Sequence, residues 1–122
     1  MSTVGVGFDL VDVERFAVLM RRRPHVLDRL FSTRERREGR DQPERMAARF
    51  AAKEATWKAL GVGLGAAPLR DVEVQRTPSG EALLVLYGTA AQLARDRGIE
   101  QWHLSLSHSA KSAGAVVVAS SS

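Results

Sequence analysis

The charged residues of one otherwise apolar segment are the first that could support chemistry. The segment RFAAKEATWKALGVG, residues 49–63, places Arg49, Lys53, Glu54 and Lys58 among alanines and large apolar residues. One explanation is structural: an i,i+4 pair between Glu54 and Lys58, with a lysine stem lying along apolar surface. The other is a site that faces an anion. Periodicity alone supports the two explanations about equally.

Two more stretches carry residues of the same kind. In GVGFD, residues 5–9, the glycines of a short strand mark close approach by another backbone or by a ligand. Asp9 follows at the strand end, where a lone Asp is more often a cap or turn residue. In SLSHS, residues 105–109, two hydroxyls and the His108 imidazole lie at another strand end, although a lone His is more often a hydrogen-bonded structural residue.

Taken together, these residues match the needs of a phosphate substrate. Asp9 and Glu54 are hard oxygen ligands on separate elements, and such sites suit Mg²⁺ that is completed by waters and substrate phosphates. The cationic complement for phosphate would be Arg49, Lys53, Lys58 and His108. In phosphoryl-type transfer, positioning and charge neutralisation supply most of the catalysis. No Walker motif is present, so an NTPase is not implied.

Composition limits the class of protein. The chain has 122 residues, which suits one domain, and its 44% apolar and 26% charged content is typical of a soluble globular protein. It has no cysteine, which excludes disulfides and thiolate metal sites. No run approaches 18 apolar residues, so no membrane span is expected and a cytoplasmic location is the default.

The net charge of +4 favours a polyanionic partner: nucleic acid, a phosphorylated cofactor or an acidic protein. The arginines are clustered over residues 21–23 and again over residues 34–40. For any one of these arginines, a solvated surface position is the more common explanation.

The elements that must position these residues follow from local patterns. The helix over 43–60 is the clearest, with Pro43 in its first turn and Gly61 at its end. Nearly all of its faces are apolar, as in a helix that is packed on several sides. Lys53 falls within the row of large apolar side chains along one face. Asp12 caps a helix over 13–22, and Ser32 with Glu35 fits a capping box.

The remaining expected elements are shorter. They are a strand over 3–9, a helix over 25–31, a loop over 39–43, a glycine-rich connection over 60–68, strands over 72–75 and 82–87, a helix over 90–97 capped by Thr89, strands over 102–108 and 113–119, and a frayed tail over 120–122. This order predicts an α+β class, in a single domain over residues 1–119.

Three blocks give the chain a resemblance to a known family. They are GVGFDLVDVERF, RFAAKEATWKALGVG and LSLSHSAKSAGAVVVA. In order and separation the sequence resembles the holo-acyl-carrier-protein synthases, the small trimeric class of 4′-phosphopantetheinyl transferases, over essentially the whole chain. The resemblance implies the fold of that family: a small mixed or antiparallel sheet packed with a long central helix, in a homotrimer with active sites between subunits.

The resemblance also implies a reaction and its participants. Such an enzyme transfers 4′-phosphopantetheine from coenzyme A to a serine of an apo acyl carrier protein and releases adenosine 3′,5′-bisphosphate. Asp9 and Glu54 would hold Mg²⁺ against the pyrophosphate. Lys58 would contact the phosphates or handle a proton, and the cofactor's phosphates would also contact Arg49, Lys53 and His108. Gly61 and Gly63 would let the backbone approach the adenosine part.

Some participants stay open at this stage. Glu54, Lys58 or a metal-bound water could take the serine proton, and the separate roles of Lys53 and Lys58 are undecided. The acidic carrier would dock on the helix after the first strand, where the chain carries Arg15, Arg21, Arg22 and Arg23. Fatty-acid, polyketide and peptide synthase carriers are all compatible, because the arginine-rich run RERREGR follows no family rule.

Two other functions compete with this interpretation. A basic nucleic-acid-binding module fits the charge, but the chain shows no helix-turn-helix, RNP or zinc pattern and has only 6% aromatic residues for stacking. A catalytically silent oligomeric scaffold is the third possibility. Asp9→Ala and Glu54→Ala separate them, because only an enzyme would lose Mg²⁺-dependent transfer while keeping its fold.

Overall fold

The computed structural model of the protein describes residues 2–63 and 65–122. Within these residues the elements are β1 (Thr3–Asp12), α1 (Val13–Arg22), α2 (Val26–Leu30), α3 (Thr33–Gly39), α4 (Pro43–Leu60), the 3-10 turn η1 (Leu69–Asp71), β2 (Val72–Arg76), β3 (Ala82–Leu86), α5 (Gly88–Asp96), β4 (Gln101–His108) and β5 (Ser112–Ser120). None of these helices is both long and apolar enough to cross a membrane.

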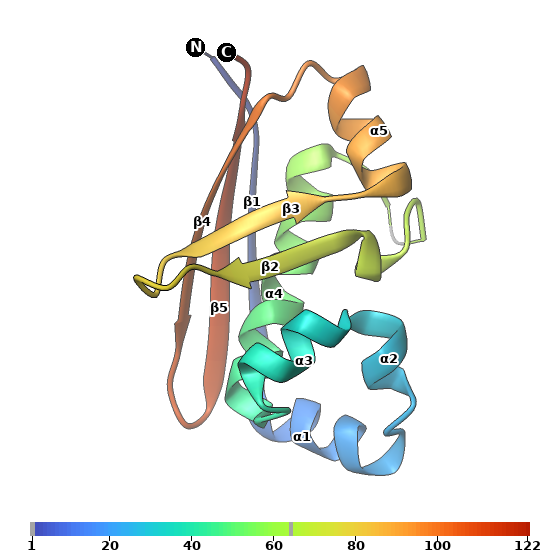
Figure 1. The fold of residues 1–122 in the computed structure, drawn as a ribbon, viewed down its shortest axis with the longest axis vertical. Coiled ribbons are helices and arrows are strands. Elements are labelled where there is room, and N and C mark those ends of the chain that lie inside the picture. The colour runs from blue at the N-terminus through green and yellow to red at the C-terminus, as the bar shows by residue number, and fades with distance from the viewer. Residues whose placement is uncertain (1, 64) are drawn as a thin grey trace.

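The strands form two antiparallel sheets. One has the order β1-β5-β4, and the other is the β2–β3 hairpin. Figure 1 shows α4 lying along the three-stranded sheet, with the hairpin crossing on the other side of α4. Helices α1 to α3 gather at one end of the molecule, and α5 lies at the other. The α+β class and the central helix are therefore confirmed.

Small residues let α4 lie close to β1. A methyl group built on Gly5 would overlap the carbonyl oxygen of Ala59, and one on Gly7 would overlap that of Ala55. Both alanines are buried. The glycines of the first block therefore serve the approach of a backbone, which is one of the two explanations that their sequence pattern allowed.

The outer edge of β2 is covered by side chains of α3. The Val74 N–H donates to Glu35 Oε2 at 2.9 Å, and the Arg76 N–H donates to Glu38 Oε1 at 3.0 Å. Alternate residues of a strand present their N–H groups to the same edge, and residues three apart lie on one face of a helix. Two carboxylates of α3 therefore take the place of a neighbouring strand and fix the hairpin against the helix.

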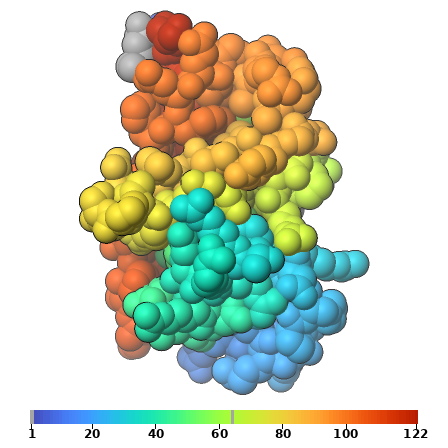
Figure 2. Space-filling view, viewed as in Figure 1, coloured from blue at the N-terminus to red at the C-terminus, as the bar shows by residue number. Residues whose placement is uncertain are grey.

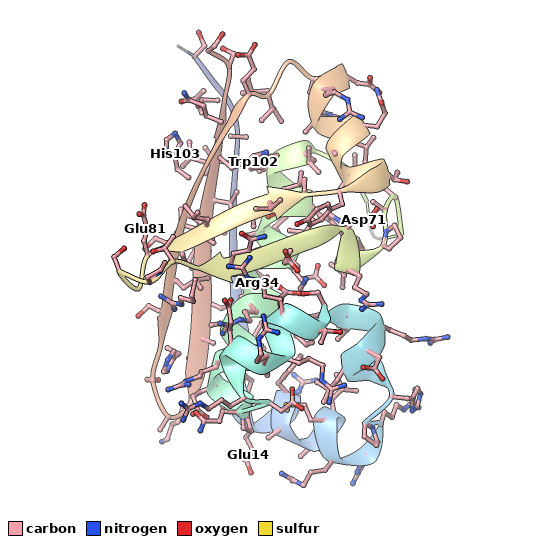
Figure 3. The ribbon with its side chains drawn as sticks, viewed as in Figure 1. Glu14, Arg34, Asp71, Glu81, Trp102 and His103 are labelled. Atoms are coloured by element: carbon pink, nitrogen blue, oxygen red, sulfur yellow. The ribbon has the colours of Figure 1, made fainter. Side chains whose placement is uncertain are left out.

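The hairpin also carries a buried carboxylate, Glu73 of β2. Its Oε1 accepts hydrogen bonds from Gln75 Nε2 at 2.7 Å and from the Tyr87 hydroxyl at 3.1 Å. Burial raises its pKa, but these bonds, another with Ser32 and the nearby Arg34 guanidinium outweigh burial, so the pKa of Glu73 lies below its ordinary value. Figure 3 shows Arg34 beside β2.

Local capping signals were reliable. Asp12 accepts a hydrogen bond from the Arg15 N–H, and the capping box between Ser32 and Glu35 forms in both directions. Gly61 ends α4 with φ of 70°, as the glycine stop predicted.

Most element ends lie within one or two residues of the prediction, and three differences have a clear structural cause. β1 continues to Asp12, because its last residues still pair with β5. The predicted cap Thr89 is wrong: α5 begins at Gly88, and the Thr89 N–H donates to Asp71 Oδ2 at 3.1 Å. Ser120, expected in a frayed tail, is buried in β5 and pairs with both neighbouring strands.

Candidate active site

Asp9 and Glu54 face the same depression, between β1, α1 and α4. Along β1 the inward positions alternate, so Asp9 is the next inward residue after Gly7. The close approach of α4 at Gly7 then brings Glu54 to Asp9. Burial and the negative charge of Asp9 raise the pKa of Glu54, and Lys58 opposes them.

Of the three acids that line this depression, Asp12 accepts from the Arg15 N–H as the cap of α1, so Asp9 and Glu54 remain as an incomplete set of metal ligands. No group of three or more His, Cys, Asp or Glu side chains in residues 2–63 and 65–122 is arranged to hold a metal ion. Mg²⁺ needs few protein carboxylates, because waters and substrate phosphates complete its shell. The mutual repulsion of Asp9 and Glu54 fits such a cation, so the residues present suit the predicted ion.

Lys58 lies at this site but not as the sequence pattern suggested. Its Nζ donates to Asp9 Oδ1 at 3.0 Å and to the Phe8 carbonyl oxygen at 3.1 Å, rather than pairing with Glu54 one turn away. The side chain is 57% exposed and the Asp9 side chain is 20% exposed. An exposed cation next to a carboxylate is well placed to meet a phosphate that approaches from solvent.

Arg49 and His108 meet in a second depression, of about 400 Å³. Arg45, Arg76 and Glu38 also line it. Arg49 and Glu54 are five residues apart, which places them about 140° apart around α4. The two depressions share no lining residue. One chain therefore carries a carboxylate site and a basic site on different flanks of the same helix.

The Arg49 guanidinium is almost completely buried in the wall of the basic depression. Only 3% of the residue is exposed, Nη1 donates to the Arg45 carbonyl oxygen at 3.2 Å, and Nε has no partner in the described residues. Burial, and then the positive charge of Arg76, lower the pKa of Arg49. A buried cation beside a second cation is a costly arrangement that a bound anion would relieve.

His108 lies on the opposite side of its strand from the predicted one. It pairs with Ala113, a buried residue, so its side is that of Leu104 and Leu106 rather than that of Ser105 and Ser107. Period-two alternation within the strand already implied this side. The sequence grouped the imidazole with the two hydroxyls, and His108 does line one depression with Ser105 and Ser107, but it also lines the depression that contains Arg49.

Lys53 is the clear departure from the expected site. It is fully buried, and its Nζ donates to Glu35 Oε1 at 2.8 Å, to the Leu69 carbonyl oxygen at 3.1 Å and to the Val72 carbonyl oxygen. An ammonium group has three donors, and all three are used inside the protein. The expectation that Lys53 contacts cofactor phosphate is therefore corrected: it joins α4 to α3 and β2.

The predicted glycine positions are separate from both depressions. Gly61 has the left-handed conformation of a helix stop, and Arg97 Nη1 lies 3.0 Å from a methyl group built on it. Gly63 is open, with nothing within 4 Å of a methyl group built on it. The structure leaves the backbone accessible at Gly63, whereas Gly61 has a structural reason to be glycine.

The arginines predicted to dock a carrier lie on or beside α1. Arg15 lines the same depression as Asp9 and Glu54. Arg21 and Arg22 form the last turn of α1, and Arg23 is its C-cap. Positive charge therefore extends from the carboxylate depression along the helix.

The outer face of the three-stranded sheet is apolar along β1, while the outward residues of β4 are His103, Ser105 and Ser107. Its large exposed side chains are Val4, Val6, Phe8, Leu10 and Val116. The four on β1 alternate with the inward glycines and Asp9, and Val116 lies on β5. Contiguous apolar surface of this kind marks an interaction site more often than a solvated face.

Sequence reasoning missed Arg45, Arg76 and Glu38. Arg45 precedes Arg49 by one helical turn, so helical spacing was a signal that could have found it. No spacing relates Arg76 or Glu38 to His108, because the hairpin and α3 bring them together only in the fold.

Comparison with known proteins gives one family. The family model of the 4′-phosphopantetheinyl transferase superfamily matches residues 5–117. A holo-[acyl-carrier-protein] synthase of Frankia casuarinae is 49% identical over 119 residues, which cover 98% of this chain and 98% of that protein.

Solved structures agree with the sequence match. The holo-[acyl-carrier-protein] synthase of Helicobacter pylori, in complex with coenzyme A, superposes with a TM-score of 0.84 at 32% identity, over 94% of this chain and 99% of that one. The Bacillus anthracis enzyme, in complex with CoA (3′,5′-ADP), gives a TM-score of 0.81 at 31% identity, over 98% of each chain.

Proposed function

Because the chain belongs to the 4′-phosphopantetheinyl transferase superfamily, we propose that it is the enzyme that converts an apo acyl carrier protein to its holo form. The substrates are coenzyme A and the carrier, as the names and complexes of the relatives indicate. The observation that carries the proposal is the pairing, in one chain, of a two-carboxylate site with a basic depression. The proposed location is the cytoplasm.

The reaction replaces a phosphoanhydride bond of the pyrophosphate with a phosphoester bond to serine. The carrier serine Oγ forms a bond to the β-phosphorus of coenzyme A, the bridging P–O bond breaks, and adenosine 3′,5′-bisphosphate leaves. The serine proton must pass to a base, and the candidates are Glu54, which lines the carboxylate depression, and Lys58, which lies beside Asp9. To accept the proton, Lys58 would have to be neutral or Glu54 would have to be ionised. The group that accepts it would then hold the proton after the attack.

Asp9 and Glu54 would hold Mg²⁺ against the pyrophosphate. The ion would supply charge neutralisation and orientation of the phosphate oxygens. Lys58, beside Asp9, supplies a further positive charge on the solvent side of the same site. The chain's own contribution is to fix these groups, and the tight contact between α4 and β1 does so.

The basic depression would bind the remaining phosphate of coenzyme A. Arg49 and His108 line it, as the sequence resemblance led us to expect for the cofactor's phosphates. A guanidinium already buried in the wall is a preorganised donor, because little of its freedom remains to be lost on binding.

The carrier would dock on α1. Arg15 reaches the carboxylate depression, and Arg21, Arg22 and Arg23 continue the positive charge away from it. An acidic carrier would be steered to this helix, which predicts an association rate that falls with salt.

The assembly would be a homotrimer with active sites between subunits. The support in this chain is the apolar outer face of β1, where Phe8 is 53% exposed and Leu10 is 64% exposed. Separation of the two half-sites on different flanks of α4 also fits a cofactor that lies between two copies.

The test follows release of adenosine 3′,5′-bisphosphate from coenzyme A and an apo carrier. Asp9→Ala and Glu54→Ala should abolish Mg²⁺-dependent release while keeping the circular dichroism of the wild type. Glu44→Gln, in the half-buried first turn of α4, is the matched control and should retain activity. Full activity in both Asp9→Ala and Glu54→Ala would reject the proposal. If these two variants and Glu44→Gln all bind duplex DNA as the wild type does, Asp9 and Glu54 have no role in binding nucleic acid.

A further inference from the structure

Lys58 bridges α4 and β1 beside the carboxylate site. Figure 2 shows α3 and the β2–β3 hairpin covering α4 on one side, and Lys53 is buried on that side. Lys58 is five residues further along, about 140° around the helix, and its side chain is 57% exposed. The proposed function places this cation near the phosphates, but gives no reason for its pairing with Asp9.

The ammonium group of Lys58 binds to β1 rather than to its neighbour on α4. Glu54 precedes it by one helical turn, which is the spacing of an ordinary i,i+4 pair. Lys58 Nζ instead donates to Asp9 Oδ1 at 3.0 Å and to the Phe8 carbonyl oxygen at 3.1 Å. These two bonds leave one of the three ammonium donors for solvent or an anion. One carboxylate of the proposed metal site therefore already holds a cation.

A metal ion and the Lys58 ammonium group would compete for Asp9. Asp9 and Glu54 are the carboxylates proposed to hold Mg²⁺. A divalent cation on Asp9 would lie close to Lys58 Nζ, which is 3.0 Å from Oδ1, and two positive charges so close repel each other. A metal ion that binds to the free protein must therefore displace the ammonium group or remain beside it, and either of these weakens its binding.

A phosphate group would remove this cost. More than half of the Lys58 side chain is exposed, so its flexible stem can carry the charge from the carboxylate to an anion that enters from solvent. The pyrophosphate of coenzyme A, which is assigned above to Asp9 and Glu54, would bring such an anion to the same site. Asp9 would then be free for the metal ion. Each ligand would therefore assist the other, because each takes one partner of the ion pair.

We propose that Lys58 couples the binding of Mg²⁺ to the binding of coenzyme A by exchanging partners, from Asp9 in the free protein to phosphate in the complex. The inference rests on the proposed function and adds to it a dependence between the two ligands: Mg²⁺ binds weakly alone and more tightly with coenzyme A. The coupling is reciprocal, so Mg²⁺ strengthens the binding of coenzyme A by the same factor.

The test measures the dissociation constant of Mg²⁺ by calorimetry, with and without saturating coenzyme A, and a blank titration corrects for Mg²⁺ that binds to free coenzyme A. The ratio of the two constants is the coupling factor. Lys58→Met should tighten the binding of Mg²⁺ to the free protein by about threefold to fivefold, the contribution of an exposed ion pair. It should lower the coupling factor by a similar amount and leave the part that comes from phosphate ligands of the metal. Lys58→Gln, a second neutral variant, should give the same result.

Arg15→Met is the matched control. Arg15 lines the same depression, but it belongs to none of the five ion pairs among the described residues. Its loss removes a nearby positive charge without freeing Asp9, so it should change both dissociation constants of Mg²⁺ alike and leave the coupling factor unchanged. If Lys58→Met also changes both constants alike, Lys58 acts only through its charge and the inference is overturned.

Lysine NMR follows the exchange of partners itself. The chain has three lysines, Lys53, Lys58 and Lys111, so isotope-labelled lysine gives three sets of signals. Mg²⁺ with coenzyme A should move the Lys58 signal, and Asp9→Asn should move it without any ligand. The Lys53 signal should stay in place, because its ammonium group is enclosed. A Lys58 signal that is the same in Asp9→Asn as in the wild type would overturn the inference.

The outcomes separate this inference from the proposed function. If the wild type transfers phosphopantetheine but Lys58→Met and Lys58→Gln keep the wild-type coupling factor, the inference is overturned and the proposed function stands. If the wild type neither transfers the group nor binds coenzyme A, both are overturned.

Discussion

Replacement of Lys53 by methionine gives the sharpest test of the structural correction. The change removes a fully buried ammonium group whose Nζ lies 2.8 Å from Glu35 Oε1. It leaves Glu35 as a buried carboxylate with two backbone donors, the N–H groups of Ser32 and Val74. Removal of one partner of a buried pair costs about 3–5 kcal/mol, so we expect a loss of this size in the free energy of unfolding.

The assay is urea unfolding at fixed protein concentration, followed by circular dichroism. The double variant Lys53→Met with Glu35→Gln removes both charges, and should be more stable than the sum of the two single changes by at least about 1 kcal/mol. That recovery would identify the pair, rather than the lysine alone, as the source of the effect.

Kinetics of the same double variant separate the two roles considered for Lys53. Because its Nζ is enclosed, KM for coenzyme A should stay within about threefold of the wild type, less than the loss of a charged contact would cause. A Lys53→Met single variant with wild-type stability and a KM raised 10-fold or more would refute the reasoning, because that result belongs to a phosphate contact.

Other predictions follow from the close contact, the hairpin carboxylate and the apolar face. Gly7→Ala should lose about 3 kcal/mol or more in urea unfolding, because its methyl group would overlap the Ala55 carbonyl. Gly114→Ala should lose less than about 1 kcal/mol, because its tightest contact is the Leu10 side chain and the Asp9 carbonyl oxygen lies at an ordinary 3.5 Å. Equal losses would contradict this. The pKa of Glu73 is lower in the folded protein, so the ionised carboxylate stabilises the fold above the ordinary pKa of 4.5, and this stabilisation is lost as the pH falls through the folded value. Glu73→Gln should therefore reduce the fall in melting temperature below about pH 4.5. An unchanged dependence of melting temperature on pH would contradict this. Phe8→Asp should convert the proposed trimer to monomers in light scattering, and a trimer of unchanged mass would exclude the sheet face as the interface.

Local sequence signals predicted most of the fold. The helix over 43–60 was correct at both ends because Pro43 and Gly61 act through backbone geometry that no distant contact needs to supply. The cap at Asp12 and the capping box at Ser32 were correct for the same reason. The error at Thr89 arose because Asp71, distant in sequence, receives its N–H.

The site was predicted in part. Asp9 and Glu54 share a depression, and so do Arg49 and His108, but the sequence did not indicate that these are two depressions. Lys53 could not be separated from Lys58 by pattern, since both are lysines of one helix within one turn of Glu54. What separates them is burial: Glu35 and the edge of β2 enclose one, while the other reaches solvent.

The most direct test of the account is the intact mass of an apo acyl carrier protein after incubation with the protein, coenzyme A and Mg²⁺. The account predicts a gain of one phosphopantetheine group per carrier, lost when Mg²⁺ is removed or when Asp9→Ala replaces the wild type. No gain in mass with any of the fatty-acid, polyketide and peptide synthase carriers would contradict it.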